Sequence, residues 1–380
     1  MAAYRISPKG VQPIIEEICS LAARWRSFKY SNGQGSAWRL QPDYTRGLPF
    51  LPIEDIVSVP NLQHLELGFP LSPRTLWPST NHNELVYRPL FRQGAPKLST
   101  LVIRAWRFHF LGLLPTHCNL TSLTIVSPKE ENRHDNTQPN PIPIFQLLSI
   151  PTLRQFALVD ETLDQPGVLP IRFDRTLPAH SPTAAAQYCR LHSLRIPAQV
   201  LPHLFSCPRQ IFEEMIHLFV GMGRGEEHLF SNLDGAPDIY VDIFPKLDFL
   251  TFYPVFSFEE ANFLMHITSN IRHLAIREYM SDLSDYYMDN ASLSAWPNLA
   301  EFYLDEIDWP QADDLHHWCL LRREIQSGFT LTIQDGLIEG RVPMEDKQRI
   351  RDLFFKSGVM KEVDYPTIPE ADKMWLSNFL

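Results

Sequence analysis

Leucines and other large apolar residues recur along this chain in one short phrase. A proline or small residue is followed by a variable residue, Leu or Ile, two variable residues, Leu or Phe, one variable residue and a further apolar residue. The first clear copy, Pro60 to Leu67, reads PNLQHLEL. Seven further clear copies begin at Pro96, Cys118, Pro151, Cys189, Pro245, Ser269 and Pro297, and weaker copies lie at 26–30 and 329–333. Eight clear copies are too many for chance, so the phrase predicts a repeat protein.

The spacing of apolar residues inside each phrase predicts a short β-strand. The last two apolar positions alternate with variable ones, as a strand with one buried face requires. One unit cannot bury that face alone, so neighbouring units must stack. A strand followed by an outer helix gives a right-handed crossover. The expected fold is therefore α/β: an irregular leucine-rich-repeat-like (ribonuclease-inhibitor-like) right-handed solenoid, with a parallel sheet on its concave face and helices and loops outside.

Individual residues test this expectation. Leu65, Leu123 and Leu274 are expected to be almost fully buried, whereas the residue after each of them, such as Glu66, should lie on the opposite strand face. Between the phrases, the spacing of apolar residues is helical in several stretches. Helices are expected at 13–25, at 211–219, after the capping box at 257–260, at 315–325 and at 344–356.

The repeats are irregular in length. Successive central residues lie between 22 and 56 residues apart, and the longest interval runs from Leu194 to Leu250. Regular leucine-rich repeats have about 20–29 residues, so insertions are expected. The solenoid is predicted to span 1–335 with nine or ten strand repeats, followed by a C-terminal helix and capping tail at 336–380. Insertions are predicted near 127–141, 160–186 and 221–235.

Composition adds a few constraints. The 380 residues are 44% hydrophobic, which suffices for a core, and the 32 scattered prolines indicate many short elements. The net charge of −10 argues against nucleic acid or an anionic membrane as the partner. No window approaches the roughly 18 apolar residues of a membrane helix, and the N-terminus lacks the apolar core of a signal peptide. We therefore expect a cytoplasmic or nuclear protein with five reduced cysteines.

Two segments contain residue types that are common in phosphate-binding or metal-binding sites, but their predicted secondary structure does not suit such a site. Gly221–Gly225 (GMGRG) is predicted to follow a helix, whereas a phosphate-binding loop follows a strand and opens a helix. His316–Cys319 contains metal-ligand residue types, but adjacent helix positions point in different directions, so surface histidines beside a buried Trp and Cys are expected. No common catalytic motif occurs. We expect a protein that is not an enzyme and takes no cofactor or metal.

The stretch 281–315 is acidic and has no Lys or Arg. Aromatic residues such as Trp296 and Tyr303 are interleaved with its carboxylates. A solvated acidic face explains this composition. Alternatively, the stretch is half of a docking surface for a basic partner, because charge complementarity steers association and aromatic residues anchor it. The nine carboxylates are Asp282, Asp285, Asp289, Glu301, Asp305, Glu306, Asp308, Asp313 and Asp314.

The variable strand positions form a second candidate surface, on the concave face where solenoids often bind extended partners. Four of them, Tyr253, Arg277, Tyr303 and Asp305, come from three successive strands and should form one patch suited to a polar peptide or loop. The alternative is that Arg277 and Asp305 only pair with each other. The predicted partner-binding residues are Arg104, Arg195, Tyr253, His273, Arg277, Tyr303 and Asp305.

A family likeness starts at Leu21–Tyr30 (LAARWRSFKY). This segment, followed at intervals by phrases such as Val59–Leu62 (VPNL) and Trp296–Leu299 (WPNL), resembles the F-box and leucine-rich-repeat-like proteins that are abundant in mushroom-forming fungi. The resemblance covers roughly residues 11–335. Family members usually begin with an F-box, an apolar helical segment with an LPxEΦ start, and nothing in Met1–Val11 supplies it.

The resemblance implies a non-enzymatic protein-interaction scaffold, similar to the substrate-recognition region of an F-box ubiquitin-ligase receptor but without an F-box. The expected partner is a protein, basic or extended, and a ubiquitin-ligase adaptor would bind only if an F-box is supplied upstream. The alternatives are a generic leucine-rich-repeat scaffold, a decayed gene fragment unrelated to ubiquitination, or an enzyme with dispersed catalytic residues.

Overall fold

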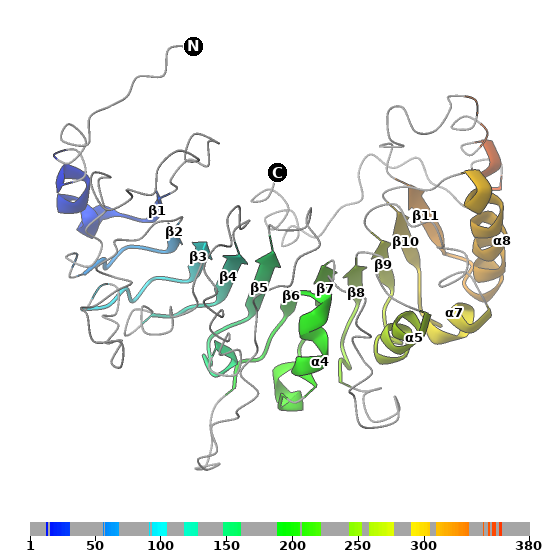
Figure 1. Ribbon diagram of the computed structural model, residues 1–380, viewed down its shortest axis with the longest axis horizontal. Helices are drawn as coiled ribbons and strands as arrows, with labels where there is room; N and C mark the ends of the chain where they lie inside the picture. The colour runs from blue at the N-terminus through cyan, green and yellow to red at the C-terminus, as the bar shows by residue number, and fades with distance from the viewer. Residues whose placement is uncertain are drawn as a thin grey trace, which may run out of the picture. The chain divides into compact units, whose positions relative to one another are not determined.

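The computed structural model divides into two compact units, Met1–Leu191 and His192–Leu380 (Figure 1). All the described strands are parallel to their neighbours and follow chain order within each unit, so the fold is α/β with an all-parallel arrangement and few helices. The structure describes residues 13, 16–30, 56, 58–67, 91, 93–104, 118–127, 147–160, 188–205, 207–221, 243–252, 258–276, 290–304, 309–333, 345, 349, 352–354 and 357–358.

The N-terminal unit contains five strands in parallel register. Each strand pairs with the next one along the chain, so that Phe28 lies beside Leu65, Leu65 beside Leu101, and Leu101 beside Leu123. The central apolar residues of successive phrases therefore form one row. The elements are η1 (Ala22–Arg24), β1 (Ser27–Tyr30), β2 (His64–Leu67), β3 (Thr100–Arg104), β4 (Ser122–Ser127) and β5 (Gln155–Asp160).

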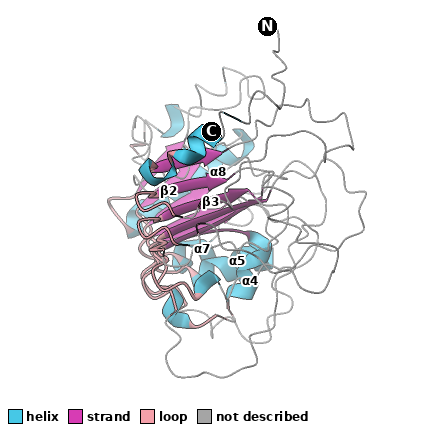
Figure 2. Ribbon diagram, turned by 90° about the vertical axis from the view of Figure 1, so that its left-hand side faces the viewer, coloured by secondary structure: helices cyan, strands magenta, loops and turns pink. Residues whose placement is uncertain are grey.

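The C-terminal unit contains six strands and most of the described helix. Helices α5, α7 and α8 lie beside strands β9 to β11 (Figures 1 and 2). The elements are β6 (Ser193–Pro197), η5 (Ala198–Val200), α4 (Leu201–Leu204), η6 (Arg209–Ile211), β7 (His217–Gly221), β8 (Phe249–Phe252), α5 (Phe258–Ile267), β9 (His273–Ile276), α7 (Asn290–Ala295), β10 (Glu301–Leu304), α8 (Trp309–Ile325) and β11 (Thr330–Ile333).

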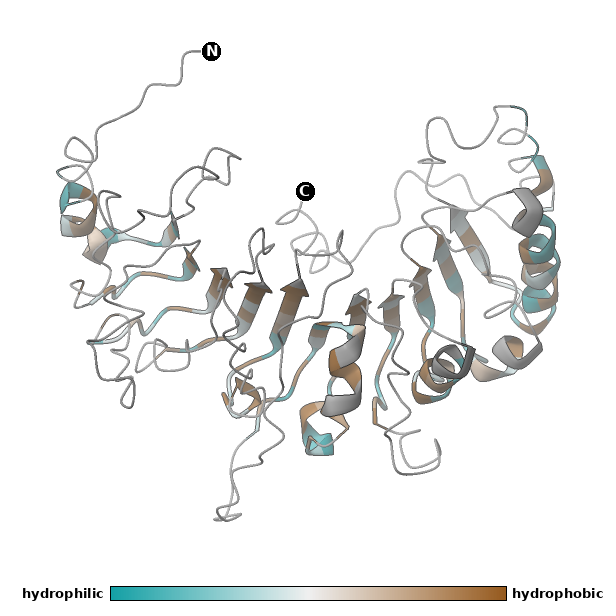
Figure 3. Ribbon diagram, in the orientation of Figure 1, coloured by the Kyte–Doolittle hydropathy of each residue, from teal (hydrophilic) through white to brown (hydrophobic). Residues whose placement is uncertain are grey.

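The strand residues predicted to form the core do so. Leu65, Leu123 and Leu274 lie in strands and are at most 2% exposed, and Figure 3 shows that the strands of both units are hydrophobic. The helices predicted at 258–265 and 315–325 are present as α5 and α8. Inside α8, Trp318 and Cys319 are buried and His317 is exposed, as the sequence indicated, but His316 is half-buried, with its ring 5.4 Å from that of Phe354.

Where the phrase begins with proline, that proline occupies a tight turn before the strand. The N–H of Leu62 donates to the carbonyl of Val59 (3.1 Å), and that of Leu247 donates to the carbonyl of Phe244 (3.2 Å). Each bond closes a four-residue turn with Pro in its second position, where the fixed φ of proline is favourable. The same bond closes the turns before Leu98, Leu153 and Leu299. Five of the 32 prolines thus occupy the same position of one repeated turn.

A shared carbonyl fixes the start of each strand. The N–H groups of Ser99 and Thr100 both donate to the carbonyl of Gln63, at 3.0 Å each. Later in the chain, the N–H groups of Arg272 and His273 both donate to Asp248, again at 3.0 Å. This repeated contact aligns the first residues of neighbouring strands, so equivalent positions of the phrase form straight rows across the sheet.

A buried arginine joins two helices of the C-terminal unit. The last carbonyls of a helix have no partner inside it, and α7 ends at Ala295. Arg322 of α8 is fully buried and donates Nη1 to the carbonyls of Leu293 (3.1 Å) and Trp296 (2.7 Å). Its guanidinium lies 5.3 Å from the ring centroid of Trp318. Burial lowers the pKa of Arg322 to about 10. Arg322 therefore fixes how α8 sits on α7.

The helix predicted at 211–219 is wrong. The chain has only a short 3₁₀ turn, η6, before strand β7, which pairs with β6 and β8. Leu218 and Val220 are buried, whereas Phe219, which the helical interpretation counted as core, is half-buried on the other face. The segment is a degenerate phrase in which Glu213 replaces the proline and Met215 the first leucine. The 56-residue interval therefore holds two repeats.

Two smaller expectations also need correction. The N-terminal helix does not bury its whole predicted apolar face, because Ile18 is 40% and Leu21 44% exposed; its helical residues end at 20 and are followed by η1. Gly221 is the last residue of strand β7, so the GMGRG segment follows a strand rather than a helix. The predicted insertions at 127–141, 160–186 and 221–235 lie beyond Ser127, Asp160 and Gly221, outside the described residues.

Candidate interaction surface on the C-terminal unit

The strand face opposite the core differs between the two units. In the N-terminal unit several third and fifth strand residues are buried: Thr124 is 9% and Glu66 7% exposed, and Val126 and Ala157 are fully buried. The first residues of β2 to β5, which are His64, Thr100, Ser122 and Gln155, are half-buried. The carboxylate of Glu66 pairs with Lys29 on the neighbouring strand, at 2.8 Å from Nζ to Oε2. Glu66 and Thr124 were predicted to lie on the strand face opposite the buried leucines. The alternation of side chains along each strand is compatible with this prediction, but neither side chain is exposed. The units differ at the third strand residues, which are more accessible in the C-terminal unit.

In the C-terminal unit, the corresponding face keeps partial exposure in two rows, apart from Ser193, which is 8% exposed. The first residues of β6 to β11 are in register and form what we name the starting row, and the third residues form the middle row. Side chains of the two rows point to the same face because strands have a period of two. The starting row is Ser193, His217, Phe249, His273, Glu301 and Thr330. The middle row is Arg195, Phe219, Thr251, Ala275, Tyr303 and Thr332.

Three rings of the starting row form a stack. The rings of His217 and Phe249 lie 4.5 Å apart with an interplanar angle of 9°, and those of Phe249 and His273 lie 4.1 Å apart with the same angle. Parallel strands are about 4.7–4.9 Å apart, so flat rings in register can stack face to face along the row. The stack pins the three side chains and exposes ring edges rather than ring faces.

Carboxylates flank the last ring of this stack. Nδ1 of His273 lies 2.9 Å from Oε2 of Glu301, and Nε2 lies 4.0 Å from Oδ2 of Asp248. Asp248 is already held by Arg272, whose Nε donates to Oδ1 (2.6 Å) and whose Nη2 donates to Oδ2 (3.0 Å). The Asp248 side chain is 18% exposed, whereas that of Glu301 is 64% exposed. Glu301 is therefore the carboxylate that this row presents to solvent.

The middle row begins with a cation and has an aromatic residue next to its last position. The guanidinium carbon of Arg195 lies 4.2 Å from the ring centroid of Phe219 on the next strand, which holds the charge above β7. Thr251 and Ala275 follow in register, and Tyr303 comes next on β10. Thr251 and Ala275 thus separate Phe219 from Tyr303, and all four side chains are half-buried.

His273 contacts a carboxylate closely through one ring nitrogen. Nδ1 lies 2.9 Å from Glu301, whereas the 4.0 Å from Nε2 to Asp248 is longer than a hydrogen bond. No cluster of three or more potential metal ligands occurs among the described residues. Pinned aromatic rings, an arginine and a solvent-exposed carboxylate are instead the components of a polar protein-binding surface.

The structure brings together three of the seven predicted partner-binding residues. Arg195, His273 and Tyr303 lie on one face of the same unit. Arg104 ends strand β3 in the N-terminal unit, and the structure does not describe its side chain. The other three, Tyr253, Arg277 and Asp305, lie outside the described residues, so the patch predicted around them stays a prediction.

Sequence reasoning missed four members of this surface. His217 and Phe219 were hidden by the helical interpretation of β7, and Phe249 was not singled out among the variable residues of its phrase. Glu301 was noted only as part of the acidic stretch. The signal was available: once the phrases are aligned on their central leucine, the residue just before it is His, Phe, His and Glu in four successive repeats.

The structure describes only part of the acidic stretch 281–315. Trp296 is fully buried and donates Nε1 to the Thr268 hydroxyl (3.1 Å), so it is no contact residue. Asp313 and Asp314 are exposed on α8. The remaining carboxylates of the stretch, apart from Glu301, lie outside the described residues.

Comparison with known proteins adds no name to this geometry. No protein-family model matches the sequence, and neither a curated protein nor a solved structure is significantly similar to it. Within the described part of the chain, no helix is both long and apolar enough to cross a membrane. The function must therefore be argued from the surface itself.

Proposed function

We propose that this chain is a leucine-rich-repeat-like (ribonuclease-inhibitor-like) right-handed solenoid that acts as a non-enzymatic protein-interaction scaffold. Its binding surface is the starting and middle rows of the C-terminal unit. The repeated turn and strand phrase supports the repeat assignment, because each phrase supplies one parallel strand and cannot bury its apolar face alone. The compartment that suits this role is the cytoplasm or the nucleus.

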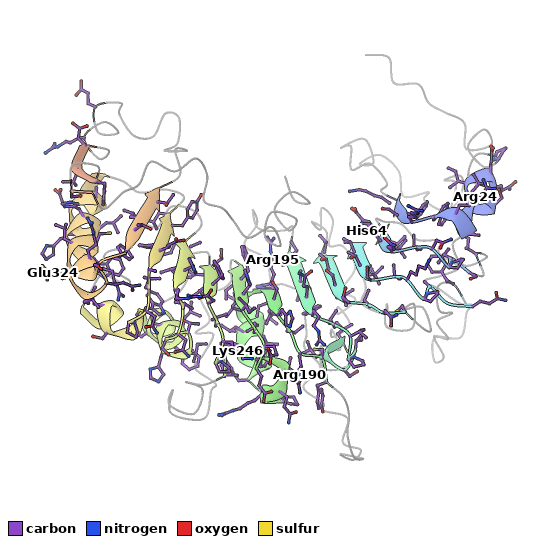
Figure 4. The ribbon with its side chains drawn as sticks, turned by 180° about the vertical axis from the view of Figure 1, so that it is seen from behind. Arg24, His64, Arg190, Arg195, Lys246 and Glu324 are labelled. Atoms are coloured by element: carbon purple, nitrogen blue, oxygen red, sulfur yellow. The ribbon has the colours of Figure 1, made fainter. Side chains whose placement is uncertain are left out.

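One observation carries the proposal. On the face opposite the core, the third strand residues Thr124 and Ala157 are buried in the N-terminal unit, whereas those of β7 to β10 are half-buried; the first strand residues are accessible in both units. In the C-terminal unit this face presents pinned rings and charges, with Arg195 visible on the sheet in Figure 4. Tyr and Arg are the residue types most often found as binding hot spots. Stacking between neighbouring strands alone would explain the aromatic rings, but it would not explain the carboxylate of Glu301 beside them, which is 64% exposed.

The proposed partner is a protein, as in the substrate-recognition region of an F-box ubiquitin-ligase receptor. A ubiquitin-ligase adaptor enters the proposal only together with an F-box, which is a separate segment from the repeats. A generic scaffold or a decayed gene fragment is compatible with the same fold. An enzyme with dispersed catalytic residues would require a nucleophile, a base and an orienting group within reach of each other.

The test is affinity purification of the tagged chain followed by mass spectrometry. The Arg195→Ala/Tyr303→Ala double variant removes two charged or aromatic contacts without touching a core position. We expect it to lose the partners that the unmodified chain captures while it stays folded, because both side chains are half-buried on the face opposite the core and their removal costs less stability than removal of a core residue.

A matched control keeps the number and type of changes similar. Lys246 lies in the turn before β8 and Glu324 on α8, away from the labelled Arg195 (Figure 4). The Lys246→Ala/Glu324→Ala variant should capture the same partners as the unmodified chain. Equal capture by the Arg195→Ala/Tyr303→Ala variant would refute the proposed surface, and loss of folding in that variant would assign its residues to structure.

A further inference from the structure

The first strand of the N-terminal unit has the least covered core residue. Phe28, the central residue of β1, is half-buried, whereas the central residue of every other described strand is at most 2% exposed. The last strand of the C-terminal unit is covered: Leu331 is fully buried, and the rings of Trp318 on α8 and Phe329, just before β11, lie 5.8 Å apart. The first and last units of a stacked-repeat protein need an outer cover, because their apolar face has no further neighbour.

A helical segment, residues 16–25, lies at the outer edge of β1 and is blue in Figure 1. One side of it faces the core: Ala22 is 4% exposed, and the ring of Trp25 stacks on that of Phe28, 4.1 Å apart with an interplanar angle of 8°. The N–H of Trp25 donates to the carbonyl of Ala22 (3.1 Å), so these two side chains lie on the same side of a tight helical turn.

Another side of the segment carries an acidic, an apolar and a basic residue in line. Glu17 lies one α-helical turn before Leu21, and the N–H of Arg24 donates to the carbonyl of Leu21 (2.9 Å), which places Arg24 one tight turn after it. Leu21 is 44% exposed, and Ile18 beside it is 40% exposed. We name Glu17, Ile18, Leu21 and Arg24 the edge stripe.

The two charges of the edge stripe are available for contact. Both side chains are exposed, and neither makes an ion pair with any residue that the structure describes. Figure 4 shows Arg24 at the outer end of the N-terminal unit, beyond His64 of β2. An exposed apolar pair flanked by opposite charges is a composition suited to contact with another protein surface.

The spacing of the edge stripe makes it complementary to itself. An α-helix rises about 1.5 Å per residue and a 3₁₀ turn about 2.0 Å, so Glu17 lies about 6 Å before Leu21 and Arg24 about 6 Å after it. When two copies lie antiparallel with their Leu21 residues facing each other, Glu17 of each copy is opposite Arg24 of the other. A parallel arrangement would instead oppose like charges.

We propose that the edge stripe is a self-association surface, and that its partner is a second copy of this chain, packed antiparallel about a twofold axis at Leu21. Such an interface uses the same patch on both copies, so each dimer has two ion pairs between Glu17 and Arg24. The patch is small, which makes the dimer weak and dependent on concentration. This surface is separate from the starting and middle rows of the C-terminal unit.

Sedimentation velocity of the full-length chain at a series of concentrations tests this inference. We expect a monomer–dimer equilibrium, and Leu21→Asp should raise the dimer dissociation constant at least about tenfold, because the dimer would bury a charge without a partner. The matched control is Leu320→Asp, at an α8 residue that is 38% exposed, and it should leave the constant unchanged. A chain that stays monomeric throughout, or a dimer that responds equally to both substitutions, would overturn the inference.

Reversing the charges gives a second readout. Glu17→Arg and Arg24→Glu should each weaken dimerisation about tenfold, because both contacts of each dimer then join like charges. An equimolar mixture of the two variants should dimerise as the unmodified chain does, because each contact again joins opposite charges. This recovery also shows that both variants are folded. No recovery, or an edge stripe that is covered only when a different protein is added, would overturn the inference.

Discussion

At the scale of single residues, Leu274 shows what one position of the phrase contributes. It lies in the middle of β9, is 2% exposed and stands in register between Leu250 and Phe302. Leu274→Ala removes its packing contacts and leaves a cavity, so we expect the free energy of unfolding to fall by about 2–5 kcal/mol. Urea denaturation followed by circular dichroism measures this.

A neighbouring position is the control for that change. Thr251 lies on the opposite face of the adjacent strand and is half-buried. Thr251→Ala should shift the unfolding free energy by less than about 1 kcal/mol. Equal effects of the two substitutions would contradict the assignment of a core face and an accessible face to this sheet.

Cys189 makes a prediction about pH. It is fully buried, and desolvation raises the pKa of its thiol from 9.0 to about 12, with the positive charge of Arg154 acting weakly in the opposite direction. Between pH 9 and pH 12 the unfolded chain loses the thiol proton and the folded chain keeps it. This group therefore stabilises the fold fully below pH 9, and its contribution falls by at most about 1.4 kcal/mol per pH unit up to pH 12.

The comparison with Cys189→Ala isolates this contribution from other groups that titrate in the same window. The slope of unfolding free energy against pH between 9 and 12 should be less negative in the variant than in the unmodified chain. The two curves should be parallel between pH 6 and pH 8. Parallel curves across the whole range would show that the Cys189 thiol is not desolvated in the folded protein.

At the scale of elements, β7 shows where a sequence pattern can mislead. The apolar residues Ile211, Phe212, Met215, Ile216 and Phe219 have helical spacing, but the phrase that aligns Met215 with the first leucine and Leu218 with the second predicts a strand. The strand forms because β6 and β8 supply hydrogen-bonding partners on both sides. Tertiary pairing thus overrides the local helical spacing, as is common for short segments.

Two substitutions distinguish the strand from the helix in solution. Leu218→Ala should cost about 2–5 kcal/mol because Leu218 is 1% exposed. Phe219→Ala should cost less, because its ring is half-buried and its described ring contact is with the side chain of Arg195. The helical alternative, in which Phe219 belongs to the buried face, predicts the reverse order. Thermal unfolding of the two variants decides between these orders.

At the scale of the whole molecule, the sequence predicted more of the fold than of the surface. The strands were predictable because the phrase fixes both the turn, through its proline, and the buried face, through its leucines. The rows were not, since they depend on register between strands that lie 24 to 36 residues apart, as between Asp248 and Arg272 or Ser99 and Gln63. Which rows stay accessible depends on burial, which differs between the units although their phrases are alike.

The central claim is that the accessible rows of the C-terminal unit contact a protein partner. Hydroxyl-radical footprinting tests it most directly, because oxidation reports the exposure of individual aromatic and histidine side chains. With a captured partner bound, oxidation of Phe219, His273 and Tyr303 should fall, while oxidation of the exposed α8 residues Leu320 and Ile325 stays unchanged. Unchanged oxidation along the rows, with protection of α8 or of the N-terminal unit instead, would contradict the claim.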